Sequence, residues 1–269
     1  MSAVHPATTR EWHRFTPAER FARYAIYLVI VAAVVVSAES IEIIPEFLVD
    51  APEQFADMFQ RMWPVAWGYY PQGVQTPLID TLNIAGLSTV FGLLMGIPVG
   101  FMAARNAVPV PVLNYFARFI LVSTRSVSTL LWALFFVAVF GPGALAGTCA
   151  IAFHSIGFIG KLFSEAVEDA NKGPIEALTA AGATPMSLIL YGYWPQVKPT
   201  FWAIALFRWD INVRESAVLG LVGAGGIGMA LDSAINLFQW DRVALILITI
   251  FVVVVIAEVV VTQIRKRII

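Results

Sequence analysis

The stretch VALILITIFVVVVIAEVVV, residues Val243–Val261, decides the fold class of this chain. It holds one charged side chain, Glu258, and one threonine among otherwise apolar residues. A helix needs about 20 apolar residues to cross the hydrocarbon core of a bilayer, so this stretch predicts a membrane-spanning helix. Glu258 lies near one end of the stretch, from which a long side chain reaches water.

The composition of the whole chain agrees with a membrane protein. Of the 269 residues, 59% are hydrophobic and 13% charged, whereas a typical soluble domain is about 25% charged. The formal net charge of −1 leaves no basic surface for nucleic acid. The single cysteine, Cys149, excludes a disulfide framework and a cysteine-based metal site. We therefore expect an all-α integral membrane protein that binds no metal and no nucleic acid.

Apolar runs predict six transmembrane helices, at 24–38, 78–104, 119–140, 144–163, 200–222 and 243–261. They divide the chain into a cytoplasmic N-terminal segment (1–23), a first transmembrane helix (24–38), a periplasmic acidic and aromatic segment (39–77) and a core domain (78–269) with five transmembrane helices. The residues Val36-Ser37-Ala38 leave open the alternative that the first run is a cleaved signal peptide.

The distribution of Lys and Arg predicts the orientation in the membrane, because cytoplasmic loops carry an excess of basic residues. With the N-terminus inside, twelve of the 17 basic residues fall on the cytoplasmic side, two fall outside and three lie within spans. We therefore expect a multi-pass protein with both termini in the cytoplasm.

The longest inner loop, residues 164–198, reads SEAVEDANKGPIEALTAAGATPMSLILYGYWPQVK. Pro174 and Pro185 suit the first turns of short helices, and Gly173 and Gly182 suit helix ends. The loop therefore predicts two short helices joined by a sharp glycine turn. The alternative is a connection without a partner, but a long structured connection in a compact chain is usually functional.

This loop resembles the EAA motif of bacterial ABC-importer permeases, E-A-A-x3-G-x9-I-x-L-P. The glutamate, the first alanine, the glycine and the proline match at that spacing, whereas Leu178, Gly192 and Trp194 replace the remaining positions. The resemblance implies a type I ABC-importer permease fold and a coupling helix that docks on the ATP-binding subunit. The coupling residues that it implies are Glu176, Ala177, Leu178, Gly182, Ala183 and Pro195.

Further segments resemble the permeases of phosphonate-type importers, a subfamily whose relatives carry phosphite and hypophosphite. They are 153–157, 161–168, 191–197, 212–214 and 222–228, so the resemblance runs from the second span to the end. It implies a homodimer in the bacterial inner membrane, surrounded by lipid. It also implies two cytoplasmic ATP-binding cassette subunits and a periplasmic substrate-binding protein. The chain itself then needs no cofactor, since the ATPase subunits bind ATP and magnesium.

Charged residues inside the fifth span are functional candidates, because charge within a bilayer is costly. At 100° per residue, Arg208, Asn212 and Glu215 share one face of a helix, while Asp210 and Arg214 are an i,i+4 pair on another. One interpretation is a path for an oxyanion, for which arginine supplies a planar fork of donors. The other is structural pairing with neighbouring residues.

Four polar residues of the third and fourth spans are further candidates for the path, namely Arg125, Ser126, His154 and Ser155. The alternative for the hydroxyl groups is a bond to the backbone or to a neighbouring helix. The predicted translocation path therefore comprises Arg208, Asn212, Arg214, Arg125, Ser126, His154 and Ser155.

The sequence gives no sign of a catalytic site. The stretch 223–228, GAGGIG, satisfies G-x-G-x-x-G but lacks the surrounding β-α-β unit of a dinucleotide site, so we interpret it as a tight turn. No phosphate-cradling loop is present, so the chain should not hydrolyse ATP alone. The alternative functions are a self-sufficient secondary transporter or channel for a small anion, which needs inverted repeats, and an intramembrane enzyme.

Overall fold

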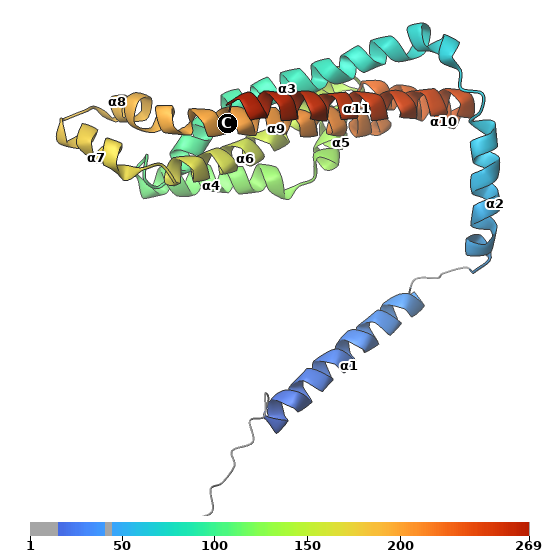
Figure 1. The fold of residues 1–269 in the computed structure, drawn as a ribbon, viewed down its shortest axis with the longest axis horizontal. Helices are drawn as coiled ribbons and strands as arrows, with labels where there is room; N and C mark the ends of the chain where they lie inside the picture. The colour runs from blue at the N-terminus through green and yellow to red at the C-terminus, as the bar shows by residue number, and fades with distance from the viewer. Residues whose placement is uncertain (1–15, 41–44, 269) are drawn as a thin grey trace, which may run out of the picture. The chain divides into compact units, whose positions relative to one another are not determined.

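A computed structural model describes residues 16–40 and 45–268, and within these ranges all regular structure is helical (Figure 1). The chain divides into two compact units, Met1–Asp57 and Met58–Ile269. Five helical runs are long and apolar enough to cross a membrane, and the bent pair α4 and α5 makes a sixth. These observations confirm the all-α membrane fold with six spans. The domain boundaries drawn from the sequence remain predictions.

The first unit contains α1 (Pro17–Ser40) and most of α2 (Pro45–Arg61). Every described side chain of α1 is exposed, although the middle of the helix is apolar. A mostly apolar helix with exposed side chains suits a span that contacts lipid. The residues Val36-Ser37-Ala38 lie inside this helix.

The second unit holds the remaining helices, which are α3 (Gln75–Ala103), α4 (Pro111–Ser126), α5 (Thr129–Phe140), α6 (Ala144–Glu168), α7 (Lys172–Ala180), α8 (Pro185–Ser187), α9 (Trp194–Leu219), α10 (Ile227–Asn236) and α11 (Trp240–Ile268). Short 3-10 helices lie at Trp67–Tyr69 and Gly220–Val222, and short π-helices lie at Tyr70–Val74 and Leu188–Tyr193. The central helix is α6, which packs against α3, α4, α5 and α9, while α11 packs against α9. We call the end of this unit that carries α7 the α7 end, and the opposite end the α10 end (Figure 1).

A glycine stripe sets the close approach of α3 to α6. Gly92, Gly96 and Gly100 repeat every four residues along one face of α3. A Cβ added at Gly100 would lie 2.8 Å from the backbone oxygen of Gly160 on α6. Small residues at this spacing let two membrane helices pack backbone to backbone. This contact fixes which residues of α6 face the other helices.

The predicted third span, 119–140, is wrong as a single helix. The helix α4 begins earlier, at Pro111, and ends at Ser126, and α5 continues at an angle of 89°. Hydroxyl side chains in this region bond to the backbone of the preceding turn, from Thr124 Oγ1 to the oxygen of Ile120 (3.0 Å) and from Ser126 Oγ to the oxygen of Val122 (2.7 Å). Such bonds bend helices, and Ser128 starts α5 in an extended conformation.

The glycine-rich stretch 223–228 is a tight turn at the α10 end, as expected from the sequence. Gly223, Gly225 and Gly226 all have positive φ, and a Cβ at Gly225 would lie 2.6 Å from the backbone nitrogen of Ala144. The Oγ1 atom of Thr81 on α3 accepts a hydrogen bond from the nitrogen of Ile227 (2.7 Å). The turn therefore joins α9 to α10 and packs against the start of α6.

Candidate functional site

The helix α7 has well-defined ends. The side chain of Asn171 caps its start by accepting a hydrogen bond from the nitrogen of Gly173 (3.0 Å). At its end, the nitrogens of Gly182 and Ala183 donate to the oxygens of Thr179 and Leu178 (both 3.0 Å). This is the Schellman arrangement, which places a left-handed residue after the helix, and Gly182 has a φ of +80°. The predicted sharp glycine turn is present.

One face of α7 packs on the protein and the other is exposed. Ile175 and Leu178 lie against Gly192, at which an added Cβ would meet Leu178 Cδ1 at 3.4 Å. Glu176 and Ala177 are exposed. Among the described residues, Glu176 has no hydrogen bond or ion pair. Leu178 therefore packs beneath the exposed face of α7 and is not part of that face.

The remaining predicted coupling residues lie beside this face. Gly182 and Pro195 are exposed, and Ala183 is half-buried. From Pro185 onward the chain stays helical into α9, so the second of the two predicted short helices is the start of the next span.

Gln196 and Tyr193 attach α7 to the helical core. The Oε1 atom of Gln196 accepts from the nitrogen of Asn171 (2.8 Å), and its Nε2 atom donates to the oxygen of Gly192 (2.7 Å). The hydroxyl of Tyr193 donates to the oxygen of Asn106 in the turn after α3 (2.8 Å). No role was predicted for either side chain, although both lie in the segment 191–197 that resembles phosphonate-type permeases.

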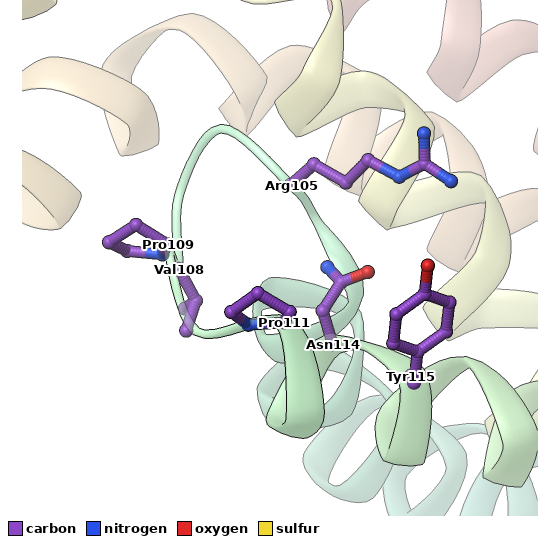
Figure 2. Close-up of a pocket in the computed structure, with 6 residues that line it drawn as sticks. All are labelled: Arg105, Val108, Pro109, Pro111, Asn114 and Tyr115. Atoms are coloured by element: carbon purple, nitrogen blue, oxygen red, sulfur yellow. The ribbon is translucent and has the colours of Figure 1, made fainter.

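An Arg118–Glu168 ion pair, 2.6 Å from Nη2 to Oε1, joins α4 to the end of α6. The same carboxylate oxygen accepts from the nitrogen of Arg105 (3.0 Å), and Arg118 Nε donates to the oxygen of Ala103 (3.1 Å). The adjoining α3–α4 turn borders a cavity of about 370 Å³ (Figure 2), lined by Arg105, Val108, Pro109, Pro111, Asn114 and Tyr115. These bonds hold the ends of α3 and α6 to the middle of α4, next to α7.

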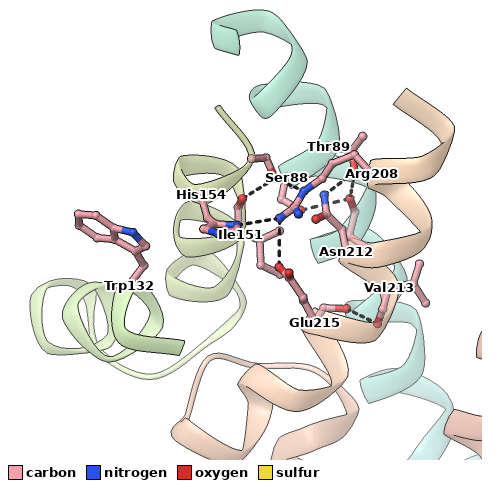
Figure 3. Close-up of polar contacts among 12 residues, drawn as sticks. Ser88, Thr89, Trp132, Ile151, His154, Arg208, Asn212, Val213 and Glu215 are labelled. Carbon is pink, nitrogen blue, oxygen red and sulfur yellow. Dashed lines mark hydrogen bonds and ion pairs between the residues drawn. The ribbon is translucent and has the colours of Figure 1, made fainter. Parts of the chain in front are cut away.

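A buried arginine cluster lies within the helical core, between α6 and α9 (Figure 3). Arg208 on α9 is 1% exposed. Its Nε atom donates to Ser155 Oγ on α6 (2.8 Å), and its Nη2 atom donates to His154 Nδ1 (3.2 Å) and to Glu215 Oε2 (3.1 Å). Its guanidinium carbon lies 5.1 Å from the ring centre of Phe158, within cation–π range. The structure thus brings Arg208, His154 and Ser155 together.

Asn212 extends this polar region towards α3. It is fully buried, and its Nδ2 atom donates to Thr89 Oγ1 (2.8 Å). Its Oδ1 atom has no partner among the described residues, and neither does Oδ1 of Asp210. Buried acceptors without donors are costly, which makes this region a candidate for water or ligand. Thr89 and Phe158 were not expected from the sequence.

Among the described residues, Arg214 and Arg125 form no hydrogen bond with Arg208, His154 or Ser155, and both are exposed on the surface of the single chain. Arg214 pairs with Asp210 one turn earlier, and the exposed fractions of the two side chains are 48% and 8%. Arg125 and Ser126 are exposed at the end of α4, where the span breaks. Arg125 borders a small cavity of about 120 Å³ together with Arg118, Leu121, Val122, Lys161 and Ser164. The roles of all seven path residues remain predictions.

Comparison with known proteins gives the family. Residues 96–269 match the model of the binding-protein-dependent transport system inner membrane component. The chain belongs to this family. Its members are membrane permease subunits of ABC importers rather than catalytic enzymes, which agrees with the multi-pass membrane fold and with the EAA-like α7 segment.

Two curated relatives have informative names. The chain is 43% identical to the phosphite transport system permease protein PtxC of Stutzerimonas stutzeri, over 71% of this chain and 70% of that protein. It is 37% identical to the phosphate-import permease protein PhnE of Mycolicibacterium smegmatis, over 87% of this chain. The matched region covers only 44% of that second, longer protein.

Solved structures support the fold. The chain resembles a chain of the inward-facing MetNI methionine ABC transporter with a TM-score of 0.63 and 23% identity, over 73% of this chain and 96% of that one. It resembles a chain of a bacterial alginate ABC transporter with a TM-score of 0.61 and 16% identity, over 90% and 99%. These likenesses confirm the type I permease fold.

Proposed function

We propose that this chain forms the translocation path of an ATP-driven importer for a phosphorus oxyanion such as phosphite, hypophosphite or a phosphonate. The observation that carries the proposal is the 43% identity to a phosphite permease over 71% of the chain. The buried arginine cluster supports it, because a guanidinium with hydroxyl and imidazole neighbours suits a tetrahedral oxyanion. Mechanistically, alternating access would expose this cluster to one side of the membrane at a time.

The coupling part of the proposal rests on α7. Its exposed face presents Glu176, Ala177 and Gly182, and small residues permit close packing in a groove of a partner. We place this face in the cytoplasm, with both termini, against an ATPase subunit that binds ATP and magnesium. A periplasmic binding protein delivers the anion at the α10 end.

A second permease copy is part of the proposal. Arg214 lies within a span and its side chain is half-exposed on the single chain. Charged residues in spans almost always face a protein interior or a water-filled cavity rather than lipid. We therefore propose a homodimer in which the Arg214 faces of two α9 helices, with Arg125 nearby, border the path, while two ATPase subunits bind below.

The test is co-purification of the tagged chain from its native membrane, followed by ATP-dependent phosphite uptake into proteoliposomes. We expect an ATPase subunit to copurify in equal ratio, and Gly182→Trp to remove both the ATPase and the uptake. Residue 182 has open space around a Cβ but a φ of +80°, so Gly182→Ala is the matched control for backbone strain alone, about 1–2 kcal/mol. It should keep the ATPase bound.

Two results would contradict the proposal. Normal uptake by Gly182→Trp would remove the coupling role of α7. Uptake by the purified chain without any ATPase would instead favour a self-sufficient secondary transporter or channel.

A further inference from the structure

The ion pair between Arg208 and Glu215 is loosely made for so buried an arginine. Only one carboxylate oxygen, Oε2, contacts the guanidinium, and it does so at 3.1 Å from Nη2. Charge-assisted N–H···O bonds are usually 2.7–2.9 Å long, and arginine and carboxylate often form two parallel bonds. Glu215 therefore accepts a hydrogen bond from only one of the guanidinium nitrogens of Arg208.

Some hydrogen-bond donors of Arg208 have no acceptor among the described residues. Its Nη1 atom makes no hydrogen bond to any residue that the structure describes, and Nη2 divides its donors between His154 and Glu215. An oxyanion with two oxygens on one phosphorus could bond Nη1 and Nη2 together. This bidentate arrangement is stronger than the single bond from Glu215.

The side chain of Glu215 is placed so that it can move away from Arg208. The exposed fraction of its side chain is 24%, whereas that of Arg208 is 2%. The carboxylate therefore lies at the edge of the cluster and borders accessible space, while the guanidinium is held in place by Ser155 and Phe158. In Figure 3, Glu215 reaches Arg208 from two turns further along α9, opposite to Ser88 and Thr89.

We propose that Glu215 is an internal competitor of the transported anion: it neutralises Arg208 when the path is empty, and the oxyanion displaces it. Arg208 then has one anionic partner at every stage, which avoids the cost of an uncompensated buried charge. Return of Glu215 to Arg208 helps to expel the anion. This inference rests on the proposed function and assigns Glu215 as the residue that sets both affinity and release.

The experiment uses the purified complex of permease and ATPase without the binding protein, so that the affinity of the membrane subunit itself is measured. The midpoint of thermal unfolding is recorded against the concentration of sodium phosphite, phosphate or methylphosphonate. Glu215→Gln removes the competing charge, and the anion concentration for half-maximal stabilisation should fall about tenfold. In proteoliposomes with the binding protein, maximal phosphite uptake should fall by a similar factor, because release is slower.

Two further variants make the result specific. Glu168→Gln is the matched control, because it makes the same change in another Arg–Glu pair of this chain, and it should leave the half-maximal concentration unchanged. Glu215→Asp keeps the charge but shortens the side chain by one methylene. It should shift the half-maximal concentration in the same direction as Glu215→Gln, by a smaller factor, and it decides the question if Glu215→Gln does not fold.

Opposite results overturn the inference. If Glu215→Gln or Glu215→Asp leaves the half-maximal concentration unchanged or raises it while wild type responds to an anion and takes it up, Glu215 only positions Arg208 and the proposed function stands. If the wild-type complex neither responds to nor transports any of the three anions, the proposed function fails and this inference fails with it.

Discussion

Two Arg–Glu ion pairs among the described residues differ in the parts of the molecule that they join. At the α7 end, Arg118 and Glu168 are 2.6 Å apart, and their side chains are 31% and 33% exposed. Within the span, Arg208 and Glu215 are 3.1 Å apart, and their side chains are 2% and 24% exposed. The more exposed pair is the shorter one, although burial strengthens electrostatic attraction.

The surroundings of the two pairs explain this difference. Arg118 and Glu168 also bond backbone groups of the α3–α4 turn, so they join helix ends that stay together. Among the residues that the structure describes, Arg208 bonds only to side chains, those of Ser155, His154 and Glu215. A side chain can rotate away from its partner without disturbing a helix, whereas a backbone group cannot. The comparison indicates a fixed junction at the α7 end and an exchangeable charge pair inside the membrane.

The largest effect is expected from Arg208→Ala, which removes the centre of the buried cluster. Breaking a buried ion pair by deleting one partner costs about 3–5 kcal/mol, and the exposed edge of Glu215 places the expected loss near the lower value. Phosphite uptake should be abolished, and thermal unfolding of the complex should begin at a lower temperature. Uptake close to wild type would show that the cluster lies outside the path.

An intermediate effect is expected from Glu168→Gln at the α7 end. The amide oxygen still accepts from the nitrogen of Arg105, but the charge opposite Arg118 is lost. Because both side chains are about one-third exposed, solvent screening reduces the cost to about 1 kcal/mol. Thermal unfolding measures this loss. A stability loss as large as that of Arg208→Ala would contradict the distinction between the two pairs.

The smallest effect is expected from Lys161→Gln. Lys161 and Glu165 form an i,i+4 pair of 2.8 Å on α6, and their side chains are 41% and 48% exposed. Such surface pairs contribute about 0.3–0.5 kcal/mol, so the thermal unfolding curve should nearly match that of wild type. A destabilisation above that of Glu168→Gln would show that this part of α6 is covered in the assembled complex.

The sequence predicted the spans better than their shape. Length and apolarity located α6, α9 and α11, although some predicted ends differ from the observed ones by five to seven residues. The break between α4 and α5 was missed because the run 119–140 is apolar enough to pass as one helix. Its hydroxyl residues were a local signal. The bend also depends on a contact across it, in which Trp132 Nε1 donates to the oxygen of Thr124 (3.3 Å).

The polar cluster, like the spans, was only partly predictable from the sequence. Helical spacing correctly placed Arg208, Asn212 and Glu215 on one face of α9. The same sequence could not show that Ser155 and His154, more than fifty positions away, would lie opposite that face. Nor could it show that Arg125 borders a small cavity together with Arg118 and Lys161.

The sequence by itself determined that this chain is a helical membrane protein, because backbone groups in lipid must bond within their own helix and apolar length alone reveals each span. It also determined the α7 turn, since Gly182 adopts a conformation that other residues disfavour. Only the tertiary structure decided which charges meet. Within one helix the spacing is fixed, but the rotation of α6 against α3 and α9 depends on close packing at glycines such as Gly100, and that rotation places Ser155 and His154 against Arg208.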